Sequence, residues 1–139
     1  MNLITVAVVA NGSTEELKYT LESIVAQSTE DFDVITVCGG TPDDVTAAAH
    51  GYADEYVGFS VLECEKMLIP QCRNLAAANA KTEYIMFVDA GDYLAPESIE
   101  KIIKTAEEKK PDIITTRCYV SGEGEPYYEH WNDLLATVS

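Results

Sequence analysis

Three stretches of this chain are apolar almost without a break, and they limit the folds that it can adopt. They are rich in β-branched residues: LITVAVVA at residues 3–10, FDVITVC at residues 32–38 and EYIMFVD at residues 83–89. A strand with one face in water alternates apolar and polar residues, whereas runs like these are typical of strands buried on both faces. The sequence therefore predicts the strands of a mostly parallel sheet that lies between layers of helices.

Segments with helical periodicity separate these strands, as the crossovers of a parallel sheet require. Ser13 and Glu16 form a capping box at the start of the first helix, and Thr41 is expected to cap the second. The expected helices cover residues 13–27, 41–51, 70–80 and 96–110. Two further strands are expected, one over residues 56–62 that is weakened by Gly58 and one over residues 112–120.

The alternation of strands and helices gives the predicted fold class, an α/β three-layer sandwich with a mostly parallel sheet. We expect residues 1–120 to form one domain and residues 121–139 to form a C-terminal tail, which could be the start of a further half.

The balance of charge excludes several classes of partner. The chain has 24 acidic and 9 basic side chains, with a formal net charge of −15 at pH 7. Such a chain is repelled by nucleic acid and by anionic membranes unless a basic patch intervenes, and the sequence shows no such patch. We therefore expect no nucleic-acid partner.

The cysteines and the N-terminus indicate where the chain resides. Cys38, Cys64, Cys72 and Cys118 have neither the spacing of a zinc site nor the density of a disulfide scaffold, so we expect reduced, mostly buried thiols. The chain has no signal-peptide pattern and no apolar stretch of the roughly 18 residues that a membrane span needs. A cytoplasmic location without a membrane span is expected, and homo-oligomerisation stays open.

Two carboxylates follow the strand at residues 83–89, where ligands bind in sheets of this kind. Asp89 and Asp92 are separated by Ala90 and Gly91. Carboxylates held this close repel each other, and a divalent cation relieves that cost. Alternatively, Asp89 ends the strand and Asp92 orders a turn.

Other residues at the same edge also have two interpretations. Asn11-Gly12-Ser13 and Gly39-Gly40-Thr41 allow close approach of a phosphate to a helix N-terminus, but both also suit a plain strand-to-helix turn. Arg73 could grip a diphosphate through forked hydrogen bonds, or it could pair with one of the many acids.

Taken in order, these segments resemble the nucleotide-binding half of the family 2 glycosyltransferases, which have the GT-A fold. ITVAVVANGSTEELKYTLESIVAQSTEDFDVITVCGGTPDD is similar to the family's opening strand, helix, second strand and acidic loop. QCRNLAAANAKTEYIMFVDAGDYLAPESIEKII is similar to its Ala-Arg-Asn helix, its Gly-Glu-Tyr-Ile strand and its Asp-x-Asp loop. The resemblance covers about residues 3–120 and implies transfer of a sugar from a nucleotide-diphosphate sugar, most commonly a UDP-sugar, to an unknown acceptor.

The resemblance also implies which residues would bind. Ala10 and Asn11 would lie near the base and ribose, Gly39 would belong to the nucleotide-binding loop, and Arg73 would approach the base or the diphosphate. Asp89 would begin the motif that holds Mn²⁺ or Mg²⁺, a cation that would neutralise charge on the departing diphosphate.

Three departures from the family pattern favour a second hypothesis. Cys38-Gly39-Gly40-Thr41 stands where the family usually has Asp-Asp-Gly-Ser. Gly91 stands where a metal-binding Asp is expected, and Asp92 is the nearest substitute. A half that binds the acceptor and carries the catalytic base would normally extend well beyond this length. The alternative is a catalytically inactive GT-A-like domain that serves as a binding or interaction module. A receiver-like signalling domain fits less well, because the chain lacks an acidic cluster after its first strand.

Overall fold

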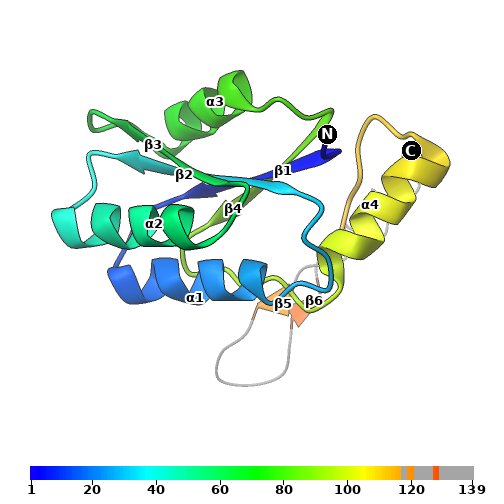
Figure 1. Ribbon diagram of the computed structural model, residues 1–139, viewed down its shortest axis with the longest axis horizontal. Helices are drawn as coiled ribbons and strands as arrows, with labels where there is room; N and C mark the ends of the chain where they lie inside the picture. Colours follow the sequence, from blue (N-terminus) through cyan, green and yellow to red (C-terminus); the bar gives the residue numbers. More distant parts are fainter. Residues whose placement is uncertain (117–118, 121–126, 129–139) are drawn as a thin grey trace. The chain divides into compact units, whose positions relative to one another are not determined.

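Four parallel strands form the centre of the fold (Figure 1). A computed structural model describes residues 1–116, 119–120 and 127–128. In chain order the elements of this part are β1 (Ile4–Val9), α1 (Thr14–Val25), β2 (Asp33–Gly39), α2 (Asp43–Glu55), β3 (Phe59–Cys64), α3 (Ile69–Asn79), β4 (Tyr84–Asp89) and α4 (Ser98–Lys109). The strand order is β3-β2-β1-β4, and all three pairings are parallel.

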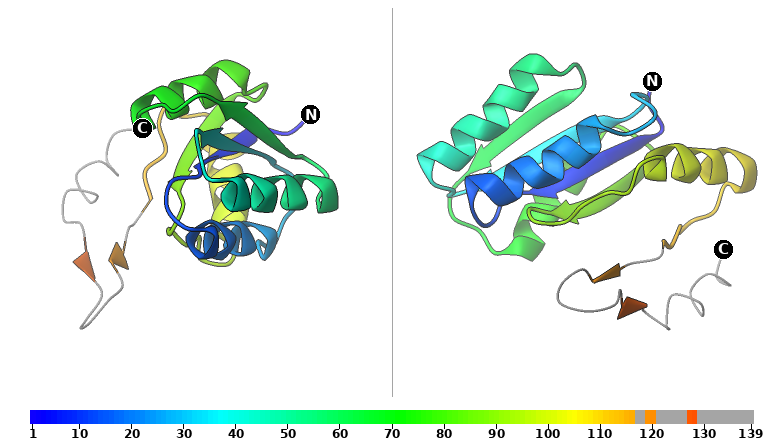
Figure 2. Two further views of the ribbon diagram at one scale, coloured as in Figure 1. Left: turned by 90° about the vertical axis from the view of Figure 1, so that its left-hand side faces the viewer. Right: turned by 90° about the horizontal axis from the view of Figure 1, so that it is seen from below.

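The chain divides into two compact units, Met1–Glu100 and Lys101–Ser139. In the first unit α1 and α2 lie on one face of the sheet and α3 lies on the other (Figure 2). This arrangement confirms the predicted three-layer α/β/α fold. The predicted boundary at residue 120 and the tail at 121–139 stay predictions, and most of that tail lies outside the described residues.

The two central strands account for the long apolar runs. Every residue of β1 is buried, and so are the five inner residues of β2. Side chains alternate between the two faces of a strand, so Ala7 and Val9 pack with α3 residues Cys72 and Ala76. Ile4, Val6 and Val8 face the helices on the opposite side, where Leu17 of α1 is fully buried. Two-sided burial is thus the reason for the unbroken hydrophobicity.

The strand β4 lies at one end of this sheet. It pairs with β1 from Ile4↔Tyr84 to Val9↔Asp89, and no further strand joins its other edge among the described residues. Val88 is buried, whereas Phe87 is 42% exposed. An apolar strand is therefore held at an edge of the sheet.

The second unit corrects one prediction. Residues 112–116 form no strand, and the pair that follows, β5 (Tyr119–Val120) with β6 (Tyr127–Tyr128), is antiparallel and separate from the main sheet. Ile113 is 63% exposed, so this stretch lacks the two-sided burial that a central parallel strand requires.

Two smaller corrections concern α2 and β3. Pro42, not Thr41, is the N-cap residue of α2, and its side chain has no acceptor with which to cap the helix. The Thr41 hydroxyl lies 2.7 Å from the Thr46 hydroxyl. The helix continues past Gly51 to Glu55. β3 begins only at Phe59, after a turn at Gly58, whose φ is +87°.

The predicted capping box of α1 is confirmed. The amide N–H of Glu16 donates to the Ser13 hydroxyl at 3.1 Å, and the amide N–H of Ser13 donates to Glu16 Oε1 at 3.2 Å.

Replacing Ser13 with alanine should lower the free energy of unfolding by about 1 kcal/mol, because one N-terminal amide loses its acceptor. Urea denaturation checks this value, and Ser60→Ala, outside any helix, is a control expected to change less.

Within the described ranges, none of the helices combines the length and the apolar character that a membrane span needs.

Candidate functional site

The loops after β1 and β4 meet at one carbonyl. Val9 O accepts the amide N–H of Asn11 at 3.0 Å and that of Ala90 at 3.1 Å. The amide of Ala10 is buried and donates to Val37 O at 3.0 Å, which fixes the start of the first loop, whereas Asn11 itself is exposed. The carboxyl ends of these strands therefore present a rigid backbone and an exposed asparagine at the edge where ligands bind.

An ion pair from α3 joins this edge. Arg73 Nη2 lies 3.0 Å from Asp89 Oδ2 and 3.3 Å from Asp89 Oδ1. The two side chains are 41% and 34% exposed, so a ligand can reach both of them. Arg73 Nε is buried and makes no hydrogen bond within the described part of the chain. The structure thus brings together two predicted site residues and leaves one buried donor atom unsatisfied.

Asp92 closes a tight turn with Asp89. The Asp92 amide donates to Asp89 O at 3.0 Å, and the Asp89 amide donates to Asp92 Oδ2 at 3.2 Å. This geometry matches the turn-ordering role that the sequence left open for Asp92. One oxygen of the exposed Asp92 carboxylate accepts this hydrogen bond, and the other makes no hydrogen bond among the described residues.

Gly91, at the middle of this turn, has a φ of +102°, which residues with a side chain rarely adopt. Its amide donates to Thr20 Oγ1 at 2.9 Å and to Glu16 O at 3.2 Å. An aspartate at this position would be strained in the present backbone, which accounts for the glycine where the family pattern has an acid.

A row of buried polar residues, two on α1 and one just after its C-terminus, contacts the segment after β4. Thr20 donates to Asp92 O at 2.6 Å, and the Ser23 hydroxyl accepts the Leu94 amide at 3.1 Å. Gln27 donates to Ala95 O at 2.9 Å and accepts the Ile99 amide at 3.0 Å. This row was not predicted, although its spacing of three and four residues is visible in the sequence.

Glu16 has a second set of contacts that the sequence did not predict. Beyond its capping role, its carboxylate lies against both neighbouring loops: Oε2 is 3.3 Å from the point where a Cβ would stand on Gly12, and 3.3 Å from that point on Gly91. A third carboxylate is therefore close to the Asp89–Asp92 turn.

The predicted loop at Gly39 packs closely against the connection between β3 and α3. A Cβ on Gly39 would lie 2.9 Å from Cys72 Sγ, and one on Gly40 would lie 2.7 Å from Lys66 Cα. Gly40 also has a φ of +67° and donates its amide to Cys64 O at 2.9 Å. This close packing accounts for Gly39, where the family pattern has a carboxylate, and for Gly40, where the family pattern also has glycine.

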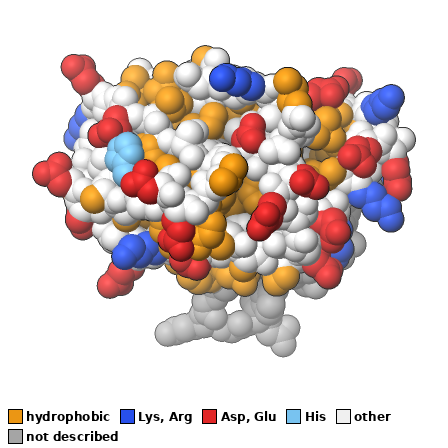
Figure 3. Space-filling view, viewed as in Figure 1, with side chains coloured by type: hydrophobic (Ala, Val, Ile, Leu, Met, Phe, Trp, Pro, Cys, Tyr) orange, Lys and Arg blue, Asp and Glu red, His pale blue; other side chains and the backbone are white. Residues whose placement is uncertain are grey.

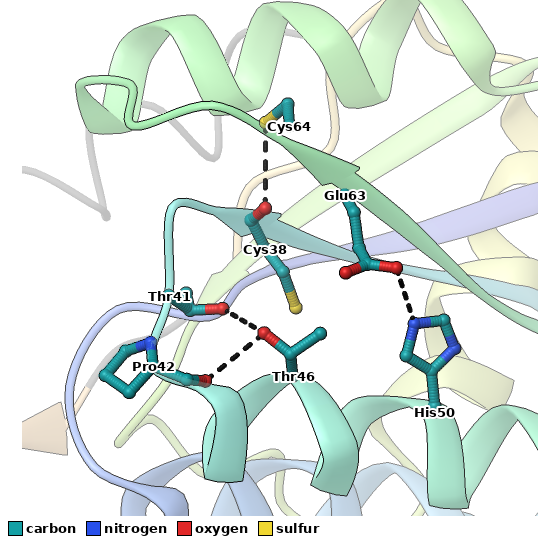
Figure 4. Close-up of polar contacts among 7 residues, drawn as sticks. All are labelled: Cys38, Thr41, Pro42, Thr46, His50, Glu63 and Cys64. Atoms are coloured by element: carbon teal, nitrogen blue, oxygen red, sulfur yellow. Dashed lines mark hydrogen bonds and ion pairs between the residues drawn. The ribbon is translucent and has the colours of Figure 1, made fainter.

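The β2–α2 side of the sheet holds a second polar cluster (Figure 4). Cys38 is buried near the hydroxyls of Thr41 and Thr46, and burial raises the pKa of its thiol. His50 Nε2 lies 2.9 Å from Glu63 Oε2, and both side chains are about half exposed. A buried thiol of raised pKa is a poor nucleophile, and an exposed ion pair stabilises little, so this cluster is best explained as structural.

The distribution of charge bears on which ligands fit. On the face in Figure 3 acidic side chains are spread widely, while Lys and Arg side chains are scattered singly. Among the described residues, no group of three His, Cys, Asp or Glu side chains is arranged to hold a metal ion. A cation at this edge would therefore depend on Asp89 and Asp92 together with oxygen atoms from a ligand.

Comparisons with known proteins agree on a family. The model of the family described as "Glycosyl transferase family 2" matches residues 5–136. The uncharacterized glycosyltransferase EpsJ of Bacillus subtilis is 29% identical over 94 residues, which are 68% of this chain and 27% of that protein. The teichoic acid poly(glycerol phosphate) polymerase of Staphylococcus epidermidis is 35% identical over 103 residues, 71% of this chain and 14% of that protein.

Solved structures share the fold. S. aureus TarS 1-349 in complex with UDP superposes with a TM-score of 0.78 at 23% identity, covering 90% of this chain and 38% of that one. The mannosyltransferase PcManGT of Pyrobaculum calidifontis, in complex with GDP-Man and Mn²⁺, gives a TM-score of 0.68 at 18% identity, covering 78% and 33%. The chain therefore spans well under half the length of the relatives and structures that it resembles.

Proposed function

Because the chain belongs to glycosyltransferase family 2, we propose that it is the donor-binding part of an enzyme that transfers a sugar from a nucleotide-diphosphate sugar to an acceptor. The observation that carries the proposal is the pair of Arg73 and Asp89 at the carboxyl edge of the sheet, beside the loop after β1. A guanidinium offers a diphosphate a permanent positive charge and forked donors, in a chain whose net charge is −15.

The other predicted residues have supporting roles in this proposal. The buried backbone of Ala10 and the exposed side chain of Asn11 would meet the base and ribose. Gly39 would allow backbone approach, and Asp89 would hold the Arg73 guanidinium in place. UDP is the first nucleotide to test, because structures of TarS are described in complex with UDP and with UDP-GlcNAc.

A divalent cation is part of the proposal. Carboxylate oxygens are the hard donors that Mg²⁺ and Mn²⁺ take, and such ions are often held by one or two carboxylates together with substrate phosphates. Asp89 and Asp92 would be those ligands, through the lone pairs that Arg73 and the Asp89 amide leave free. When bound, the cation would supply Lewis-acid neutralisation of charge on the diphosphate.

Replacing Asp92 with asparagine should remove any enhancement of UDP binding by Mn²⁺ and leave binding in EDTA unchanged. The asparagine carbonyl can still accept the Asp89 amide, so the turn is kept while the negative charge is lost. Calorimetric titration with and without Mn²⁺ measures both quantities. An undiminished Mn²⁺ effect in the variant would assign Asp92 to the turn alone.

The proposed function is tested by titrating the chain with UDP, UDP-GlcNAc and GDP, each in Mn²⁺ and in EDTA. We expect binding of a uridine nucleotide at millimolar concentration or below. If the folded chain binds no nucleotide in that range, the donor-binding proposal is wrong.

A second candidate is a GT-A-like domain that is catalytically inactive and serves as a binding or interaction module. It is favoured by Cys38 and Gly39, which stand where the family pattern has two carboxylates, and a Cβ on Gly39 would lie only 2.9 Å from Cys72 Sγ. A chain that is folded, as judged by circular dichroism, but binds no nucleotide would support this candidate.

The predicted cytoplasmic location also stays a proposal. Cys38, Cys64 and Cys72 are free thiols, which supports a reducing compartment.

A further inference from the structure

Three sulfur-containing side chains gather beside Gly39. Cys64 is the last residue of β3 and pairs in register with Gly39, and its Sγ lies 3.6 Å from the Sδ of Met67. Cys72, in α3, places its Sγ 2.9 Å from the point where a Cβ on Gly39 would stand, and Met67 Cβ is 3.6 Å from the same point. Cys72 and Met67 thus occupy the space that a side chain on Gly39 would need, and Cys64 lies beside Gly39 on the neighbouring strand.

All three residues lie on the α3 side of the sheet. Cys72 belongs to the buried cluster on that face, and Cys64 packs against the cluster. Cys38, although adjacent to Gly39, points to the opposite face, toward Thr46 of α2 (Figure 4). Two thiols and a thioether thus converge from β3, α3 and the connection between them, while Cys38 is kept apart.

The donor set suits a soft metal ion. Thiolate and thioether sulfurs select ions such as Cu(I), whereas Mg²⁺ and Mn²⁺ prefer oxygen. Cys72 is 3% exposed, but Met67 is 36% exposed and Cys64 is partly exposed, so an ion can enter from the surface. This group of sulfur atoms lies beside Gly39 and not at the Asp89–Asp92 turn, and its third donor is a methionine.

We propose that Cys64, Met67 and Cys72 form a binding site for one Cu(I) ion, which would pin the β3–α3 connection over Gly39 and Gly40. Binding exchanges two thiol protons for two Cu–thiolate bonds, with the Met67 thioether as the third donor, and no electron is transferred. Because the protons must leave, affinity rises with pH. Burial raises the pKa of the Cys72 thiol, which keeps that thiol protonated at neutral pH until a metal displaces the proton.

The test is a titration of the reduced chain with Cu(I), under anaerobic conditions and against a chromogenic Cu(I) chelator such as bicinchoninate. We expect one equivalent of Cu(I) to be withheld from the chelator, with thiolate-to-copper absorbance in the near ultraviolet. Cys64→Ser and Cys72→Ser should each weaken binding by at least about 100-fold, and Met67→Leu by about tenfold, if each removes one donor.

The control variants distinguish binding at this site from a general affinity of Cu(I) for thiols. Cys38→Ser and Cys118→Ser each remove one cysteine and should leave the bound equivalent unchanged. The absence of a protected equivalent in the unmodified chain, or an equal loss of binding in Cys38→Ser and Cys64→Ser, would overturn the proposal. If Cys72→Ser fails to fold, Met67→Leu and Cys64→Ser, at more exposed positions, still decide the outcome. Nucleotide is absent throughout, so the result does not depend on the proposed sugar transfer.

Discussion

Replacing Gln27 with alanine should lower the free energy of unfolding by about 2–4 kcal/mol, since several buried groups lose their partners together. The Gln27 side chain is 8% exposed. Its Nε2 donates to Ser23 O at 3.1 Å and Ala95 O at 2.9 Å, and its Oε1 accepts the Ile99 amide at 3.0 Å. Alanine satisfies none of these groups, and water has poor access to them.

The matched control is Gln71→Ala, which removes a glutamine from the first turn of α3. Gln71 is exposed, and its Oε1 accepts only the Leu68 amide at 2.9 Å among the interactions of the described residues. We expect it to cost about 1 kcal/mol or less. Urea denaturation of both variants checks the difference, and equal losses would show that the contacts of Gln27 with residues 94–99 add little stability.

Replacing Arg73 with alanine should weaken UDP binding by about 10- to 100-fold, which corresponds to about 1.4–2.8 kcal/mol. The variant loses the cation proposed to meet the diphosphate, and it also leaves the Asp89 carboxylate unpaired beside the incoming negative charge. Like charges brought together in a partly exposed site repel each other, so the two effects act in the same direction. Calorimetry at constant ionic strength measures the change.

Two further variants make this result specific. Arg73→Lys keeps the charge but loses the planar fork, so its affinity should lie between those of the wild type and Arg73→Ala. Lys18→Ala removes one positive charge from the exposed side of α1 and should change binding little. If Arg73→Ala binds UDP as the wild type does, Arg73 is a structural partner of Asp89 and not a ligand contact.

The central part of the fold could be predicted because its physical cause is local. Unbroken apolar runs identified β1, β2 and β4 as strands of a parallel sheet, although only β1 and β2 are buried on both faces. The fifth strand could not be judged in this way, because Ile113 and Ile114 resemble a short strand whether or not a partner strand is available.

The details of the site depend on contacts between distant segments, and these are not visible in a single sequence. The pairing of Arg73 with Asp89 joins α3 to β4, and the sequence offered many other acids as partners. Thr20 and Gln27 interrupt the apolar face of α1, and their purpose becomes clear only when the backbone of residues 89–99 lies against them. From the sequence, Gly91 was interpreted as the loss of a metal-binding aspartate. Its φ of +102° shows that the turn itself favours glycine at this position.

The position of β4 at the edge of the sheet has a consequence for handling the protein. Open strand edges are templates for association between copies of a chain; among the described residues no strand pairs with the second edge of β4, which carries the exposed Phe87. At pH 7 the formal charge of −15 makes copies repel one another, but this repulsion disappears as the pH falls toward the isoelectric point near 4.2. Acidic buffers should therefore promote precipitation through this edge, and high salt, which screens the repulsion, should do so to a smaller extent.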